Sequence, residues 1–466
     1  MAILNLKLGI VPTEFSRSRR GLLPVRSPRA GLVTKRINAA DDETTKSEKK
    51  KPEICTADEL HYADVANSEW KIALWRYLPS PKARPRKHPL LLLPGVATNA
   101  IGFDLSPQSS FARFMSTQGF DTWILELRGI GLSAHVMESK SGKLHSKLLE
   151  SVINFPERLS GFLDGGQNSF ITGLSRDFSQ KLLNFIEESQ QYSRPSFFHF
   201  HERAPVDDFL EQFEQMRKYN WDFDHYLEED LPAAMEYVRT QCKPKDGKLL
   251  AIGHSMGGIL LYSLLSLCSF QGRESGLTSV TTLGSSLDYT SSHSTLKLAI
   301  PVADPARALN IPAIPIGEFI SVIHPLVCHP PYILSWLTHQ FSYPGMMDPQ
   351  LFEKLVLNNF CTVPAKLLLQ LATAFQEGGL QSRNGTICYK DHLSKSNVPI
   401  LAVAGDHDLI CPPVAVYDTI KTIPEHLVTY KVFGKSGGPH YDVVGGRQAA
   451  HQVYPCIVNF LNTHDV

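Results

Sequence analysis

Short apolar runs of strand length recur along the chain, and segments with helical periodicity separate them. The runs cover residues 90–93, 122–127, 248–252, 280–283, 399–404 and 427–433. Before them, residues 71–78 alternate polar and apolar side chains as a half-buried strand does. Residues 111–118 and 226–240 repeat apolar side chains at helical spacing. This alternation predicts an α/β fold with a mostly parallel central sheet flanked by helices.

Two stretches interrupt the alternation. Residues 134–220 are polar and charged, while residues 291–395 are much more apolar and are the better candidate for a mostly helical cap. The cap is either a kinked lid or a set of core helices. Its most apolar part, 311–336, contains five prolines, a glutamate and two histidines, which make a lipid-exposed helix costly. We therefore expect no transmembrane segment, and the cap is the candidate surface for peripheral membrane contact.

These changes in composition divide the chain into seven segments. They are a transit peptide at 1–40, a disordered linker at 41–53, core parts at 54–133, 221–290 and 396–466, a polar insertion at 134–220 and the apolar cap at 291–395. The insertion either docks a partner or is a solvated loop, and composition favours the loop.

The first forty residues are rich in arginine and lysine and carry one acid, Glu14. Such a composition is typical of transit peptides, so we expect a plastid protein, with mitochondrial import as the alternative. A disordered basic tail would have the same composition. A secretory signal is not expected, because polar residues break the apolar run at 4–11.

Charge and cysteine content argue against a nucleic-acid-binding protein, a disulfide-rich protein and a zinc protein. Lysine plus arginine and aspartate plus glutamate both total 46, so no overall field favours nucleic acid. The eight cysteines are dispersed and form no Cys-x-x-Cys pair, which favours a reducing compartment. His324, Cys328 and His329 lie close together, but prolines interrupt them and no second ligand pair follows at zinc-site spacing. We expect neither a metal nor another cofactor.

The strongest chemical motif is Gly-His-Ser-Met-Gly at 253–257. It follows a strand-like run and precedes a helix-like one, which is the context of a nucleophile at a strained strand-to-helix turn. Ser255 is therefore the candidate nucleophile, and the alternative is a bystander serine in a glycine-rich turn.

A serine nucleophile needs a base, and the base needs a carboxylate that orients it. Asp406 and Asp408 both follow the apolar run at 399–404, and we favour Asp408 because an apolar, proline-rich loop exit follows it. His440, in a glycine-rich loop after 427–433, is the favoured base over His407 and His451.

The oxyanion that forms in acyl transfer needs backbone N–H donors. The expected donors are the residue after the nucleophile, Met256, and a residue in the loop after an early strand, Val96. The loop Pro-Gly-Val-Ala at 94–97 follows the run at 90–93 directly. The alternative interpretation is that 94–97 is an ordinary glycine-containing turn that supplies no oxyanion donor.

Together these motifs resemble the α/β-hydrolase family. The resemblance rests on 93–96, on Glu-Leu-Arg-Gly-Ile-Gly-Leu-Ser at 126–133, on 253–257, on 405–408 and on His440. The amino-acid sequences at 221–234 and 438–442 resemble those of the acid-lipase and polyhydroxyalkanoate-synthase branch. No counterpart is evident for 134–220.

Two departures bear on function. The family's usual His-Gly after the early strand is Pro94-Gly95 here, which keeps the backbone donor. The synthases use cysteine where this chain has Ser255. The resemblance thus implies hydrolysis of carboxylic esters, with the apolar cap favouring lipid-like acyl chains. An acyltransferase with the same triad and a non-catalytic binding protein of this fold stay open.

Overall fold

The computed structural model describes residues 55–135, 218–299, 338–343, 345–434 and 439–466, with the shorter pieces 312–317, 320–321 and 324. The predictions for the transit peptide, the linker and nearly all of the polar insertion lie outside the described residues. So do parts of the predicted cap.

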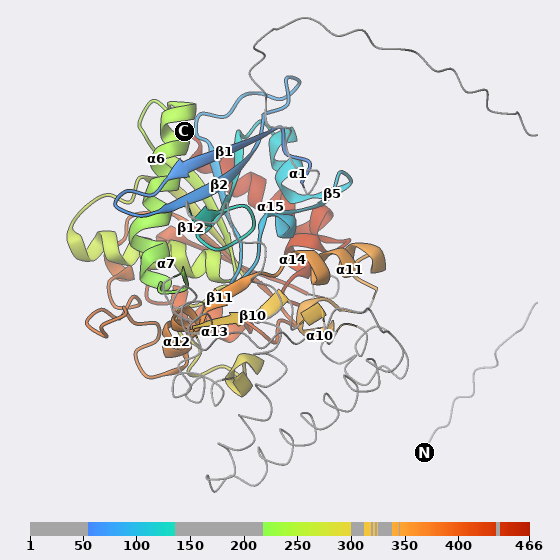
Figure 1. Ribbon diagram of the computed structural model, residues 1–466. Coiled ribbons are helices and arrows are strands. Elements are labelled where there is room, and N and C mark those ends of the chain that lie inside the picture. The colour runs from blue at the N-terminus through green and yellow to red at the C-terminus, as the bar shows by residue number, and fades with distance from the viewer. Residues whose placement is uncertain are drawn as a thin grey trace, which may run out of the picture. The chain divides into compact units, whose positions relative to one another are not determined.

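A nine-stranded sheet forms the centre of the described chain (Figure 1). In spatial order its strands are β1 (Glu59–Asp64), β2 (Trp70–Tyr77), β6 (Thr122–Glu126), β3 (Leu90–Leu93), β8 (Leu249–His254), β9 (Leu277–Leu283), β12 (Ile400–Gly405) and β13 (Val428–Phe433), while the short β7 (Ala134–His135) pairs with β2. All neighbours from β6 to β13 are parallel, and β1, β2 and β7 pair antiparallel. The predicted mostly parallel sheet is confirmed.

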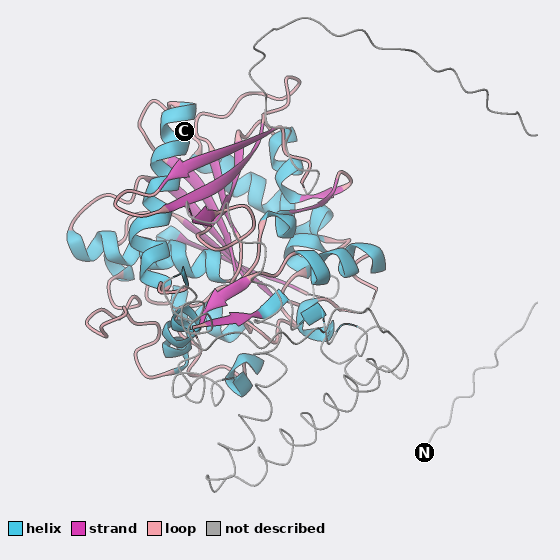
Figure 2. Ribbon diagram, viewed as in Figure 1, coloured by secondary structure: helices cyan, strands magenta, loops and turns pink. Residues whose placement is uncertain are grey.

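Both faces of the sheet are buried, as the continuous apolar runs require. Leu91 and Leu93 point into one hydrophobic cluster and Leu90 and Leu92 into the other, because successive side chains of a strand alternate in direction. Helices α6 (Leu231–Cys242) and α7 (Met256–Gln271) cover the first face, and α1 (Phe111–Thr117) and α15 (Ala449–His464) cover the second (Figures 1 and 2).

The edge strand β1 was not predicted. Its sequence, Glu-Leu-His-Tyr-Ala-Asp, is half polar, and only Ala63 is buried. An edge strand with little burial has no strong period-two pattern, so the sequence alone does not distinguish it from a loop.

The helix predicted at 226–240 begins differently from the expectation. After the short α5 (Phe223–His225), the turn η3 (Tyr226–Asp230) is π-helical, and α6 starts only at Leu231. The N–H of Leu231 bonds to the carbonyl of Tyr226, five residues back, and Pro232 has no N–H to offer. Asp230 in this turn is fully buried and pairs with Arg128 at 2.6 Å.

The remaining elements are short. They are η1 (Ala100–Phe103), β4 (Asp104–Ser106), β5 (Ser109–Ser110), η4 (Thr295–Ala299), β10 (Ala313–Pro315), α10 (Thr338–Phe341), α11 (Pro349–Asn358), β11 (Thr362–Pro364), α12 (Ala365–Ala372), η6 (Thr373–Phe375), η7 (Leu393–Lys395), α13 (Pro413–Ile420), η8 (Glu425–Leu427) and α14 (Asp442–Gly445). Among the described helices, none combines the length and the apolar character needed to cross a membrane.

A buried serine in α7 gives a first prediction. Ser263 is fully buried, and its hydroxyl has no hydrogen-bond partner among the described residues. Because an unpaired buried hydroxyl carries a desolvation cost, Ser263→Ala should raise the free energy of unfolding by about 1 kcal/mol. Urea denaturation measures this change, and a clear loss of stability would show that the hydroxyl has a partner.

Candidate active site

The strand order reverses between β3 and β8. The chain passes from β3 to β6 on one side of β3 and later reaches β8 on the other side. In open α/β sheets, such a reversal is where ligands bind, beyond the carboxyl ends of the strands. The loop 94–99, called here the Val96 loop, follows β3, and Ser255 follows β8.

Ser255 stands at a strained turn between β8 and α7. Its φ of 54° and ψ of −121° lie in a region that residues other than glycine rarely adopt. Glycines on both sides of Ser255 allow the backbone segments of this turn to pack closely. A Cβ on Gly257 would lie 2.7 Å from the carbonyl oxygen of Pro94, and one on Gly253 would collide with the Gly257 backbone. The Ser255 N–H also bonds to the Leu283 carbonyl at 2.9 Å.

Asp408 follows β12 and His440 follows β13, and these two parallel strands are neighbours in the sheet. His440 Nδ1 lies 2.7 Å from Asp408 Oδ2, and both side chains are almost fully buried. Asp408 Oδ1 accepts the N–H groups of Ile410 at 2.9 Å and Cys411 at 2.7 Å. The carboxylate is thus fixed on one oxygen by the backbone and presents the other to the histidine.

His440 Nε2 is buried, and no described residue bonds to it. Gly284, after β9, packs on the His440–Asp408 pair. A Cβ there would lie 3.0 Å from Asp408 Oδ2 and from His440 Nδ1. This close approach accounts for glycine at a position with φ of 54°.

The competing candidates lie elsewhere. Asp406 Oδ2 is 3.6 Å from the ring of His407, and the His407 side chain is 67% exposed. His451 is exposed on α15. The structure therefore brings together Asp408 and His440, and it gives Asp406, His407 and His451 no comparable buried pairing with each other.

Comparisons with known proteins give matches among solved structures. A soluble variant of monoglyceride lipase from Saccharomyces cerevisiae, solved with a substrate analog, shares 14% identity with a TM-score of 0.51, over 88% of this chain and 96% of that chain. The chain has the α/β-hydrolase fold. An esterase from Thermogutta terrifontis shares 13% identity, covers 88% and 100% of the two chains and has a TM-score of 0.44. A monoacylglycerol lipase from Paleococcus ferrophilus shares 12%, over 84% and 99%, with a TM-score of 0.41. No protein-family model and no curated protein matches the sequence.

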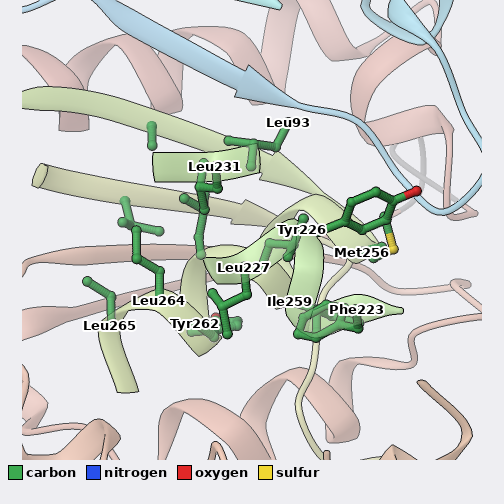
Figure 3. Close-up of a cluster of buried hydrophobic side chains, with 14 of the residues drawn as sticks. Leu93, Phe223, Tyr226, Leu227, Leu231, Met256, Ile259, Tyr262, Leu264 and Leu265 are labelled. Atoms are coloured by element: carbon green, nitrogen blue, oxygen red, sulfur yellow. The ribbon is translucent and has the colours of Figure 1, made fainter. Parts of the chain in front are cut away.

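In this hydrolase fold, the loop that contains Val96 packs against Ser255, and Met256 follows the serine directly. A Cβ on Gly95 would lie 3.2 Å from the Ser255 Cβ, which places the Val96 loop directly against the serine. Met256 begins α7, where the first N–H groups of a helix have no partner within the helix. Its side chain is anchored in the hydrophobic cluster that also holds Tyr226 (Figure 3).

A buried carboxylate ties two loops at this edge of the hydrolase fold. Glu126, at the end of β6, accepts the N–H of Ala100 at 3.0 Å and that of Leu132 at 2.8 Å. Burial raises the pKa of this carboxyl group above its usual range. Glu126 lies in the motif at 126–133, but the sequence gives no sign that it holds the chain just beyond the Val96 loop.

His254 contacts the candidate base and was not predicted. Its Nε2–H donates to the His440 carbonyl at 2.9 Å, and the two rings are 4.7 Å apart. Burial, with His440 close by, lowers the pKa of His254 to about 3, so the ring is neutral. Its only sequence signal is its place directly before Ser255, which does not reveal the carbonyl it binds.

The pKa of His254 predicts how stability depends on pH. The folded-state pKa of about 3 is below the ordinary value of 6.5, so the unfolded chain binds this proton first and acid destabilises the fold. His254→Gln removes the titrating group and keeps a neutral donor. Between about pH 7.5 and pH 5, wild type should lose about 2 kcal/mol more than the variant in urea unfolding. Parallel losses would contradict a buried neutral histidine.

The sequence predicts that His324, Cys328 and His329 do not form a metal site. Only His324 belongs to the described residues, and among those residues no cluster of three histidine, cysteine or acidic side chains could hold an ion.

Proposed function

We propose that this protein is a serine hydrolase that cleaves carboxylic esters. The observation that carries the proposal is the buried His440–Asp408 pair, in which Nδ1 is bonded and no described residue bonds to Nε2. A histidine held in this way has one tautomer, with the proton on Nδ1 and a lone pair on Nε2. His254, which directly precedes Ser255 in its strained turn, contacts His440.

The proposed reaction proceeds through an acyl-enzyme. His440 Nε2 takes the proton from the Ser255 hydroxyl as its oxygen attacks the ester carbonyl, and Asp408 stabilises the charged ring. The N–H groups of Val96 and Met256 stabilise the oxyanion. His440 then gives its proton to the leaving alcohol. Water, deprotonated by the same nitrogen, attacks the acyl-enzyme and releases the acid.

We further propose an apolar or lipid-like acyl group as substrate. Phe341 and Phe360, from the predicted cap, have ring centroids 5.8 Å apart. Phe341 bonds through its carbonyl to the Tyr441 N–H, next to the candidate base, and Phe360 pairs with Thr98 in the Val96 loop. Backbone contacts thus hold two aromatic residues of the predicted cap next to the segments that carry His440 and Val96. The similar yeast structure is named as a lipase, which agrees with this substrate class.

Turnover of p-nitrophenyl esters with short, medium and long acyl chains tests the proposal. We expect hydrolysis that falls to background in Ser255→Ala and that favours the longer chains. Acyl transfer to an added alcohol at the expense of free acid would instead identify an acyltransferase. A folded protein that turns over no ester would support the binding-protein alternative.

For the N-terminus we propose removal after import into plastids, on the basis of its arginine-rich, acid-poor composition alone. Import of the labelled full chain into isolated chloroplasts and into mitochondria, with the new N-terminus identified by mass spectrometry, tests this. An uncleaved chain outside both organelles would contradict it.

A further inference from the structure

A short segment of the predicted cap pairs with the Val96 loop. In residues 358–361, called here the brace, the carbonyl of Asn359 accepts the Asn99 N–H at 2.9 Å. The carbonyl of Asn358 accepts from Asn99 Nδ2 at 2.8 Å, and the N–H of Cys361 donates to the Ala97 carbonyl at 2.7 Å. The brace therefore fixes the Val96 loop through its backbone.

The Val96 loop needs such support. Ala97 has a φ of 57°, a left-handed conformation that costs a residue with a Cβ about 1–2 kcal/mol. Strained residues of this kind persist where the surrounding contacts determine them. The hydrogen bond from Cys361 to the Ala97 carbonyl is one such contact, and it lies one residue from the proposed oxyanion donor Val96.

The side chain of Asn359 extends from the brace to the other half of the site. It is fully buried, and its Nδ2 donates to the Tyr441 hydroxyl at 3.2 Å. Tyr441 directly follows His440, and its ring lies 5.0 Å from His254. Burial raises the pKa of Tyr441, so its hydroxyl stays neutral. The hydroxyl oxygen fills the space that a Cβ on Gly102 would need, so it has little room to shift.

We propose that Asn359 is a positioning residue that couples the oxyanion donor at Val96 to the general base His440. It acts through its backbone carbonyl on one side and through Tyr441 on the other. This inference rests on the proposed hydrolase function. It assigns to the cap segment a part in aligning the reacting groups, besides any part in binding the acyl chain.

Two substitutions test the coupling. Asn359→Leu keeps the approximate size but removes both polar groups of the amide, and Tyr441→Phe removes the hydroxyl, which can donate as well as accept. Each should lower kcat for a p-nitrophenyl ester about 10- to 100-fold with KM changed less than about threefold, because misalignment affects the transition state more than binding. The double variant should be no slower than the slower single variant, since both break the same link.

The matched control is Asn459→Leu, the same substitution at an exposed asparagine on α15, outside the brace and the proposed site. It should retain wild-type kcat. Concentrations of active sites come from burst titration, so that a partly unfolded variant is not counted as slow.

The outcomes distinguish the positioning role of Asn359 from the proposed hydrolase function. If wild type hydrolyses esters and both Asn359→Leu and Tyr441→Phe match its kcat per active site, the positioning role is wrong and the hydrolase proposal stands. Effects that simply add in the double variant also overturn the link. If Asn359→Leu fails to fold, Tyr441→Phe decides alone. A wild type without any esterase activity is a failure of the proposed function itself.

Discussion

Ser255→Ala is expected to lower kcat for ester hydrolysis by about 10⁵- to 10⁶-fold, which is the largest effect that the structure predicts. The substitution removes the atom that forms the acyl-enzyme, and only oxyanion donors and binding remain to act on a water attack. Alanine at a φ of 54° has the same backbone cost as serine, so the fold should be unchanged. Progress curves at high enzyme concentration measure the residual rate.

Ser263→Ala is the matched control, because it removes a buried serine hydroxyl from the helix that Ser255 precedes. Its kcat should equal that of wild type. A Ser255→Ala protein that stays folded and keeps more than about one per cent of wild-type activity would contradict the role of Ser255 as nucleophile.

Asp408→Asn is expected to lower kcat by about 10⁴-fold. The amide oxygen can still accept the N–H groups of Ile410 and Cys411, but the amide nitrogen then faces His440 Nδ1 as a donor. His440 would turn to the tautomer with its proton on Nε2, and that nitrogen could no longer take the proton of Ser255.

Asp406→Asn distinguishes this role from a general loss of charge in the loop. Asp406 lies near the exposed ring of His407, so its replacement should change kcat less than about threefold. Equal losses in Asp406→Asn and Asp408→Asn would mean that the loop conformation, and not the Asp408–His440 hydrogen bond, limits the rate.

Much of the fold could be predicted from the sequence because its strands are buried on both faces. The apolar runs at 90–93 and 122–127 correspond to β3 and β6, and the turn at Ser255 follows a strand as its glycines indicate. The proposed triad residues each follow a strand, so their order along the chain and the parallel sheet were enough to place them at one edge.

The parts that could not be predicted depend on contacts between distant segments. Asn359 is one of many polar residues in an apolar stretch, and only the folded chain shows its link to Tyr441, 82 residues away. His254 was visible in the motif, but its bond to the His440 carbonyl joins positions 186 residues apart. The π-helical turn before α6 arises with a buried ion pair between Arg128 and Asp230, which a helical periodicity does not reveal.

Covalent labelling with a serine-directed fluorophosphonate tests whether Ser255 is an activated nucleophile. Purified wild type and Ser255→Ala are incubated with the reagent and examined by intact mass and peptide mapping. We expect one adduct per wild-type chain, located on Ser255, and no adduct in Ser255→Ala. An unlabelled but folded wild type, or a label on another residue that persists in Ser255→Ala, would contradict this expectation.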